Sequence, residues 1–355
     1  MSTRAWVLGR GGLLGSNVAR ALGQVGPGVA LRDINPGEHG TPGQQTTPGQ
    51  QRTSGEHTPG QQGARTWSWT DLPAFASEIE RATADFARDA AGAPWIIVWA
   101  AGASFIGSPP ELLARDVELL RALLAALSAS GLATGAGPGL IVLASSAGGV
   151  YGHSPDTLIS ESSPCRPASE YGSSRLAMEA ALAAWSATAP RVSTLIARIS
   201  NLYGPRQNFA KRQGLISHLV RSVIYNRPVN MFVPLDTIRD FLYAPDCAAR
   251  LTACIERWAA RAHEPAVHVQ KIFASEQTTT VGQVIHHIAR LARRPLRVLT
   301  RATAATVQQV AVLRFRSEVW RELDRCQYTE LKVGLARVYR DLLRRYREGH
   351  LASPD

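Results

Sequence analysis

A tyrosine and an arginine stand four residues apart in the segment YGSSRLAME (171–179), and a serine pair, Ser145 and Ser146, precedes them. Residues at this spacing share one face of a helix. A phenol exchanges protons poorly near neutral pH because its unperturbed pKa is about 10, and a nearby positive charge favours the phenolate. Tyr171, Arg175 and a serine hydroxyl would therefore form a proton-transfer site. The spacing alone is weak evidence, because a surface pair shows it too.

A glycine-rich turn, GRGGLLGS, lies between an apolar run at 5–8 and a helical pattern of apolar residues at 18, 22 and 25. Glycines let the backbone adopt positive φ and approach a pyrophosphate, while the N-terminus of the next helix offers free N–H groups. A tight turn without a ligand is the alternative. The segment predicts a strand, a dinucleotide-binding turn and a helix, with glycines at three-residue intervals: Gly9, Gly12 and Gly15.

The next apolar run, 29–31, ends in Arg32 and Asp33. An acid about 20 residues beyond the turn would accept hydrogen bonds from an adenosine ribose. The guanidinium of Arg32 could instead meet a 2′-phosphate. The pair favours NAD as the cofactor and leaves NADP open.

These two segments and four others resemble the extended short-chain dehydrogenase/reductase family, in its NAD-dependent epimerase/dehydratase branch, which acts on nucleotide sugars. The resemblance covers nearly the whole chain. GRGGLLG resembles the family's TGxxGxxG, and YGSSRLAME its YxxxK helix. The other matching segments are IIVWAAGAS (96–104), LIVLASSAGGVYG (140–152), ARISNLYGPRQ (197–207) and IRDFLYAPDCA (238–248). The motifs follow one another in the family's order, which is a much stronger signal than any one of them.

The resemblance implies a role for each matching residue. Tyr171 would be the acid/base for a sugar hydroxyl, Ser146 would hydrogen-bond the same oxygen, and Ser145 is a less favoured candidate. Asn201 and Arg206 would lie near the substrate, and Arg239 would contact the nucleotide phosphates. A looser match, LRFRSEVW, brings Arg316 toward the diphosphate, and Asp246 would brace a loop. The implied cofactor-binding residues are Gly9, Gly12, Leu13, Leu14, Gly15, Arg32, Asp33, Asp71, Ala100, Ala101, Gly102, Tyr171 and Arg175.

Arg175 departs from the family, which has lysine there. Arginine keeps the charge, but its longer planar fork donates in fixed directions, so the exchange is not conservative. Three explanations remain: an active enzyme that tolerates arginine, a displaced cofactor ribose, or a binding protein without turnover. The chain has only the lysines Lys211, Lys271 and Lys332 among its 39 basic residues, so a general replacement of lysine by arginine favours the first.

The pattern of short apolar runs and longer helical segments predicts an α/β fold with a parallel sheet covered on both faces. The resemblance implies a doubly wound Rossmann-type sheet with a smaller C-terminal α/β substrate lobe. We expect a dinucleotide-binding domain over 1–202 and 228–262, and a substrate-binding lobe over 203–227 and 263–350. The fold is expected to resume at Trp67, where TWSWTDL (66–72) resembles a third strand, with Asp71 near the adenine. Helices are expected over 214–226, 281–291 and 331–346. The repeated TPGQQ of residues 36–63 predicts a disordered insertion over 36–65, since Pro, Gly and Gln bury little apolar area.

The net charge of +11 and the pI near 10.1 could suggest nucleic acid, but the arginines are dispersed, so no nucleic-acid partner is expected. The four cysteines lack metal-site spacing, and we expect no metal and buried free thiols. No apolar run is long enough to span a membrane. We therefore expect a cytoplasmic protein without a membrane partner, and the resemblance to the family implies a homodimer.

The resemblance implies a reaction that begins with hydride transfer from a sugar carbon to the nicotinamide, which leaves a ketosugar. A dehydratase would be expected to have an Asp-Glu pair after its active hydroxyl, whereas Ser146 is followed by Ala147, Gly148 and Gly149. Epimerisation needs no further acid/base, so a nucleotide-sugar epimerase is the first choice. A ketosugar reductase and a non-catalytic nucleotide-sugar binding protein are the alternatives.

Overall fold

The computed structural model describes residues 2–25, 29–32, 67–209, 214–231, 233–300, 310–324 and 328–354. Asp33, the repeats of 36–63 and the basic pair 211–212 lie outside these ranges. Statements below refer to the described residues.

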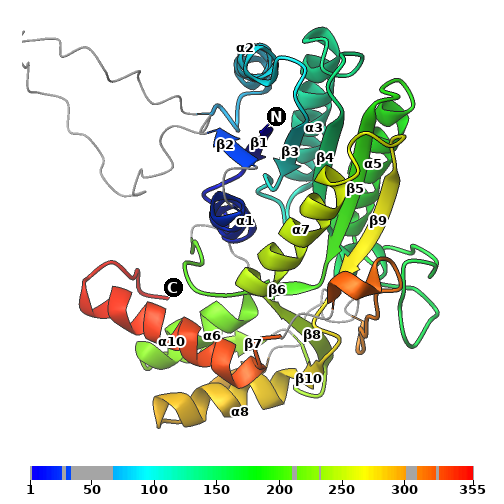
Figure 1. Ribbon diagram of the computed structural model, residues 1–355. Coiled ribbons are helices and arrows are strands. Elements are labelled where there is room, and N and C mark those ends of the chain that lie inside the picture. Colours follow the sequence, from blue (N-terminus) through cyan, green and yellow to red (C-terminus); the bar gives the residue numbers. More distant parts are fainter. Residues whose placement is uncertain are drawn as a thin grey trace, which may run out of the picture.

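Six parallel strands form the main sheet in the order β2-β1-β3-β4-β5-β9 (Figure 1). Connections run outward in both directions from β1 and β3, which makes the sheet doubly wound, as predicted. The strands are β1 (Thr3–Leu8), β2 (Val29–Arg32), β3 (Trp95–Trp99), β4 (Gly139–Ser146), β5 (Val192–Ile199) and β9 (His268–Phe273).

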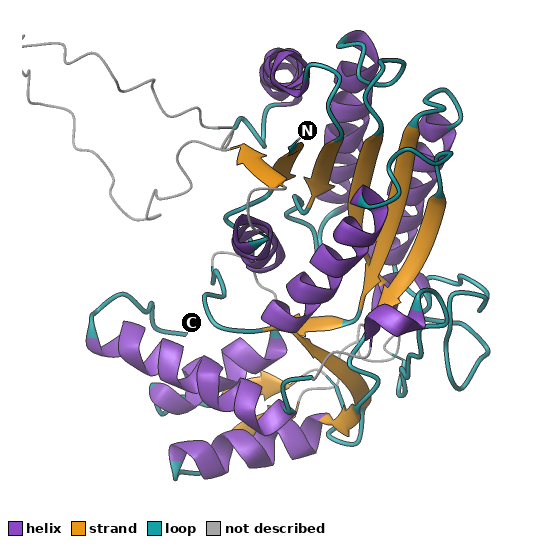
Figure 2. Cartoon of the chain, in the orientation of Figure 1, coloured by secondary structure: helices purple, strands orange, loops and turns teal. Residues whose placement is uncertain are grey.

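Helices cover both faces of this sheet, and Figure 2 shows the resulting layers of helix and strand. On one face, α1 (Leu13–Gln24) and α7 (Ala244–Ala259) enclose an apolar core with the sheet. On the other face lie α2 (Leu72–Ala90), α3 (Pro110–Ala129) and α5 (Glu170–Ser186), which enclose a second core. Burial on both faces explains the continuous apolar strands of the sequence.

A smaller lobe lies beyond the carboxyl ends of the main strands (Figure 1). Its three predicted helices are confirmed as α6 (Leu215–Ile224), α8 (Val281–Ala292) and α10 (Leu331–Arg347), which share one apolar core. A three-stranded sheet, β10 (Thr278–Thr280), β8 (Ile238–Tyr243) and β6 (Asn201–Tyr203), and a pair, β11 (Val298–Thr300) and β7 (Val229–Met231), complete the lobe.

Two strands lie on the other side of the expected domain boundaries. Strand β9, within the range 263–350, pairs with β5 in the main sheet, and β8, within 228–262, pairs with β6 and β10 in the smaller lobe. The chain therefore passes between the lobes at each of these strands. The crossings place β6 and β8 directly beside the carboxyl ends of the main sheet.

The third strand predicted at residue 67 is wrong, because residues 67–70 form no strand. The alternating tryptophans have another cause: Trp67 stacks on Trp6 at 6.1 Å between ring centroids, and Trp69 lies 5.2 Å from Phe75. Both rings pack on the core between α2 and the sheet. Period-two aromatic spacing here reflects a ring cluster, not pairing with a neighbouring strand.

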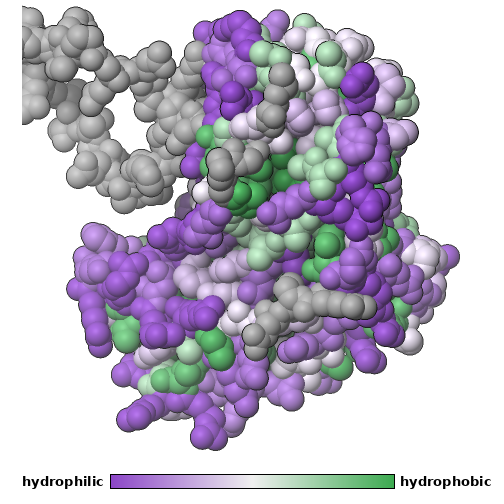
Figure 3. Space-filling model, viewed as in Figure 1, coloured by the Kyte–Doolittle hydropathy of each residue, from purple (hydrophilic) through white to green (hydrophobic). Residues whose placement is uncertain are grey.

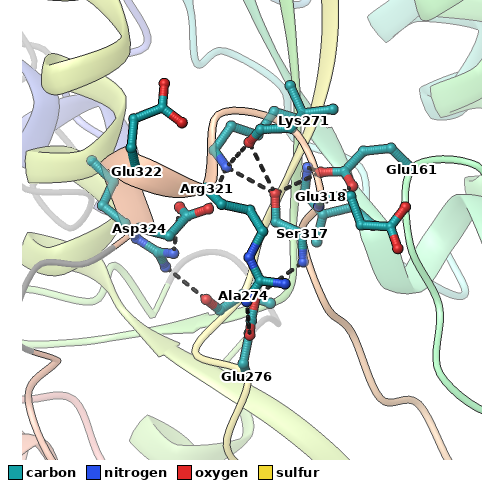
Figure 4. A network of polar contacts seen from close by, with 12 residues as sticks. Glu161, Lys271, Ala274, Glu276, Ser317, Glu318, Arg321, Glu322 and Asp324 are labelled. Carbon is teal, nitrogen blue, oxygen red and sulfur yellow. Dashed lines mark hydrogen bonds and ion pairs between the residues drawn. The ribbon is translucent and has the colours of Figure 1, made fainter.

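A buried polar network fixes the segment 310–324 across the end of β9 (Figure 4). The fully buried Lys271 donates to Asp324 at 2.6 Å and to Ser317 Oγ at 2.8 Å, and Ser317 Oγ donates to Glu161 at 2.7 Å. Asp324 belongs to the 3₁₀ turn η2 (Arg321–Asp324). The same segment contains Leu313, which lines a cavity between the lobes.

The face of the molecule drawn in Figure 3 carries many hydrophilic residues. In Figure 3 hydrophilic residues dominate the region of α10, whose last turn holds Arg344, Arg345 and Arg347. None of the described helices is long and apolar enough to cross a membrane. Cys247 and Cys254 are buried free thiols, as predicted, and burial raises the pKa of each to about 12.

Candidate active site

The glycine turn joins β1 to α1 at the point where the sheet connections diverge. Gly9 has φ +88°, and a Cβ there would lie 2.5 Å from the carbonyl oxygen of Ala100. A Cβ on Gly15 would lie 2.2 Å from the carbonyl oxygen of Gly9. Any side chain at either position would therefore break the turn.

The N-terminus of α1 is suited to an anion. No side chain caps it, and its first turn contains no acidic residue, so its N–H groups and its partial positive charge remain available. Together with the glycine cradle, these features fit the pyrophosphate of a dinucleotide.

A cavity of about 1220 Å³ lies between the lobes and reaches Leu14 in the first turn of α1, but the glycines of the turn do not line it. The main domain contributes the ends of β3, β4 and β5 and the first turns of α5, while β6, β7 and β8 line the opposite side. Of the sequence-predicted residues, the cavity is lined by Leu14, Ala100, Ala101, Gly102, Ser145, Ser146, Tyr171, Arg175, Asn201 and Arg239.

Tyr171 lies in the first turn of α5, which Ser169 caps by accepting from the N–H of Gly172 at 3.3 Å. Close packing against the short helix α4 (Ala147–Val150) fixes this turn. A Cβ on Gly172 would lie 2.1 Å from the carbonyl oxygen of Gly149, and a Cβ on Gly149 would lie 3.2 Å from the Tyr171 ring. The two glycines thus let the phenol ring lie beside the serine strand.

The two serines have different partners. Ser145 is buried and its Oγ donates to Glu179 Oε1 at 2.5 Å, and Glu179 also forms an ion pair with Arg198 at 2.6 Å. Ser146 Oγ accepts from the N–H of Gly149 at 3.1 Å, which leaves its own hydroxyl proton available to a ligand. Ser146 is therefore the better placed of the two to act on a substrate oxygen.

Arg175 is buried, and its guanidinium is already bound. Its Nη2 donates to Ser104 Oγ at 2.8 Å and to Asp116 Oδ2 at 2.9 Å, and its Cζ lies 5.0 Å from the centroid of the Tyr171 ring. The sequence reasoning missed Asp116, Ser104 and Glu179. The signal at Asp116 was faint: a carboxylate at a buried position of α3.

The second lobe presents a cation to the cavity. Arg239 donates to the carbonyl oxygens of Ile238 and Ala311, but no described carboxylate pairs with it. Burial lowers its pKa to about 10, because the charged form is desolvated without compensation. Beside it, Asn201 Nδ2 donates to the carbonyl oxygen of Asp240 at 2.9 Å. An anionic group of a ligand would compensate the charge of Arg239.

Several sequence-predicted residues lie outside the cavity lining. Arg206 and Arg316 are exposed, and the backbone N–H of Arg206 donates to Asp341. Arg32 forms an ion pair with Asp89 at 3.3 Å. Asp71 caps α2 by accepting from the N–H of Ala74 at 3.1 Å.

Asp246 has the bracing role expected of it, since it accepts from the N–H and hydroxyl of Thr329. Among the described residues no group of three or more His, Cys, Asp or Glu side chains could hold a metal ion.

Comparisons with known proteins agree with this arrangement. A dTDP-glucose 4,6-dehydratase of Neisseria gonorrhoeae is 34% identical over 104 residues, which are 29% of this chain and 29% of that protein. A dTDP-4-dehydro-6-deoxyglucose reductase of Escherichia coli is 31% identical over 116 residues, 33% of this chain and 36% of the relative. These matches thus span about a third of each curated relative.

Solved structures match over much more of the chain. The UDP-glucose 4-epimerase of Thermus thermophilus, solved in complex with NAD, has a TM-score of 0.67 at 19% identity, over 95% of this chain and 98% of that chain. This likeness supports the fold.

The model of the NAD dependent epimerase/dehydratase family matches residues 5–269. That range runs from β1 through the glycine turn, the serine strand and the Tyr171 helix to β9. The curated relatives of this chain include nucleotide-sugar epimerases, dehydratases and reductases. The chain belongs to the NAD-dependent epimerase/dehydratase family.

Proposed function

We propose that this protein is a nucleotide-sugar epimerase that uses NAD and acts through a transient ketosugar. The observation that carries the proposal is the composition of the cavity: Tyr171 and Ser146 line it together, and Glu170 is its single carboxylate among the described lining residues. Elimination of water would be expected to need an acid and a base beside the reacting carbon. Reversible oxidation needs only a proton acceptor and donor for one hydroxyl.

Tyr171 would take the proton of the sugar hydroxyl and later return it, while the hydroxyl of Ser146 would hydrogen-bond the same oxygen. NAD, when bound, supplies a hydride acceptor and donor. Its pyrophosphate would lie at the Gly9–Gly15 turn and the N-terminus of α1. Epimerisation then requires the ketosugar to present its other face, and a cavity of about 1220 Å³ offers space for such a rotation.

Arg239 would bind the diphosphate of the nucleotide sugar. A half-buried guanidinium without a described carboxylate partner is costly unless a ligand supplies the negative charge. Asn201 lines the same cavity. Arg206 and Arg316 would take part only if their exposed side chains reached the ligand from outside the cavity.

A ketosugar reductase is the second candidate, since it would use the same tyrosine and serine and consume reduced cofactor in each turnover. A non-catalytic nucleotide-sugar binding protein is the third. The observation that favours the third is the pairing of Arg175 with Asp116, because this cation is already engaged within the protein.

One experiment separates the three. The purified protein is extracted to identify bound nucleotide, and UDP- and dTDP-linked sugars are then supplied with and without NADPH. Epimerisation without net cofactor consumption is expected. Consumption of NADPH on a ketosugar would establish the reductase instead, and tight binding of a nucleotide sugar without any product would establish the binding protein.

The Tyr171→Phe variant tests the assigned acid/base. We expect turnover to fall by about a hundredfold or more, in line with the usual contribution of general acid/base catalysis, while calorimetry still detects NAD binding. An unchanged rate would remove Tyr171 from the mechanism.

A further inference from the structure

The guanidinium of Arg175 is held at its tip by groups from outside its own helix. Nη2 donates to Ser104 Oγ at 2.8 Å and to Asp116 Oδ2 at 2.9 Å, and the two charged side chains are only 7% and 2% exposed. At the same time Cζ lies 5.0 Å from the centroid of the Tyr171 ring. The cation therefore lies over the face of the phenol while its donor tip is bound by Ser104 and Asp116.

Asp116 also organises the loop that follows β3. Its carboxylate accepts from the N–H of Ala103 at 3.3 Å, from the N–H of Ser104 at 3.2 Å and from Ser104 Oγ at 2.5 Å. A Cβ on Gly102 would lie 3.1 Å from Asp116 Oδ2. One buried carboxylate thus connects α3, the loop that lines the cavity and the helix that carries Tyr171.

We propose that Asp116 is a positioning residue of this site, which fixes Arg175 against the Tyr171 ring and neutralises the charge beside the phenol. The proposal rests on the function proposed above. It explains how arginine occupies the position of the lysine in the family's YxxxK motif. The guanidinium has more donors than an ammonium group, and Asp116 and Ser104 supply acceptors for them.

The other charged groups around Tyr171 do not replace Asp116 in neutralising the charge of Arg175. A neutral buried pair acts on a neighbouring group much less than an isolated cation does. Asp116 is the only charged residue among the buried positions of α3, and Glu179 of α5 is paired with Arg198 of β5, which also binds the hydroxyl of Tyr151 beside α4. Glu170, before Tyr171, is exposed, and Arg239 lines the cavity from the other lobe.

The Asp116→Asn variant keeps the shape of the side chain and removes its charge. We expect the phenolate of Tyr171 to form at a pH lower by about one unit, the low end of the shifts that a neighbouring charge produces. The readout is the ultraviolet absorbance of phenolate as a function of pH. Subtracting the titration of D116N/Y171F from that of D116N isolates Tyr171 in the variant, and subtracting Y171F from the wild type isolates it in the native protein. The acid limb of the pH–rate profile should move in the same direction.

D116N leaves the guanidinium of Arg175 without its carboxylate partner and could fail to fold for that reason. A second pair of variants keeps the test valid in that case. The phenolate in R175K/D116N should form at lower pH than in R175K, since Asp116 neutralises either cation. Glu118→Gln is the matched control, because it removes a carboxylate from the exposed face of the same helix, where Glu118 pairs with Arg121, and should leave the titration unchanged.

Coincident titrations of D116N and the wild type, or of R175K/D116N and R175K, would overturn the proposal and leave Asp116 a structural residue. The titration needs no substrate. A wild type that turns over no nucleotide sugar would therefore defeat the proposed function while the role of Asp116 could still be decided.

Discussion

At the scale of single residues, the site is organised by which charges and hydroxyls already have partners. Ser145 is bound to the carboxylate of Glu179, and Arg175 to that of Asp116. In contrast, the hydroxyl proton of Ser146 is available to a ligand, and Arg239 has no carboxylate partner among the described residues. The groups bound to carboxylates within the protein hold the site in shape, although Nε of Arg175 has no hydrogen-bond partner in the described part of the chain. Ser146 and Arg239 are the groups that a ligand would engage.

The serine pair gives a direct test of this division. Ser146→Ala should lower kcat by about tenfold or more, because the hydroxyl would act on the substrate, and should lower the free energy of unfolding by about 0.5–2 kcal/mol through the lost cap of α4. Ser145→Ala should mainly lower the free energy of unfolding, by about 1–3 kcal/mol, since it removes a partner of the buried Glu179. Rates and urea unfolding curves for both variants check this, and the reverse pattern would assign the catalytic role to Ser145.

Arg239 allows a similar test of substrate binding. Arg239→Gln should raise KM for a nucleotide sugar by about tenfold, because a hydrogen bond to a charged group contributes roughly 1.5–3 kcal/mol. Arg316→Gln provides the comparison, and its KM should stay within about twofold of the wild type, since Arg316 is exposed outside the cavity lining. Equal effects of the two variants would show that Arg316 also reaches the ligand.

At the scale of elements, the position of Tyr171 depends on the contact between α4 and the first turn of α5. The contact is made by backbone, because a Cβ on Gly172 would lie 2.1 Å from the carbonyl oxygen of Gly149. This packing leaves no space for a side chain. The beginning of α5, which carries Tyr171, is thus set by two glycines.

Gly172→Ala should displace this turn, lower kcat by about tenfold and reduce the free energy of unfolding by about 1–3 kcal/mol, as overpacking usually does. Gly23→Ala is the control, since Gly23 lies exposed in α1 and a Cβ there meets nothing within 4 Å. It should stabilise the protein by about 0.5–1 kcal/mol through helix propensity, without changing the rate. Full activity in G172A would show that the close packing is not required.

At the scale of the whole molecule, the two lobes meet around a buried carboxylate. Asp240 of β8 accepts from Ser200, after β5, and from the N–H and hydroxyl of Ser275, after β9. Burial raises its pKa, although these hydrogen bonds act in the opposite direction. The ionised form is therefore a cost to the folded state, even though it connects the two sheets.

The sign of the pH dependence follows from that shift. Since the folded protein holds this proton more tightly, Asp240 stabilises the fold most below its ordinary pKa of 3.8 and loses that contribution as the pH rises through the raised value. The stability of the wild type relative to Asp240→Asn should therefore fall as the pH rises above about 4. Urea unfolding of both proteins across this range measures the difference, and parallel curves would contradict the shift.

The sequence by itself determined the fold class, the glycine turn, the helices α6, α8 and α10, and the pairing of Tyr171 with Arg175 on one helix face. These features depend on local periodicity, or on backbone conformations that only glycine adopts, as at Gly9. The homodimer and the assigned roles of the site residues remain predictions.

Only the tertiary structure decided which charged and polar side chains have a partner within the protein. Asp116 lies 59 residues from Arg175 in the chain and Glu179 lies 34 residues from Ser145, so no local pattern could show that these side chains meet. Equally, the sequence motifs assign both Arg239 and, by a looser match, Arg316 to the diphosphate, and the fold places the first in the cavity and the second on the surface. Compensation of charge depends on distance in space and on burial, and neither follows from spacing along the chain.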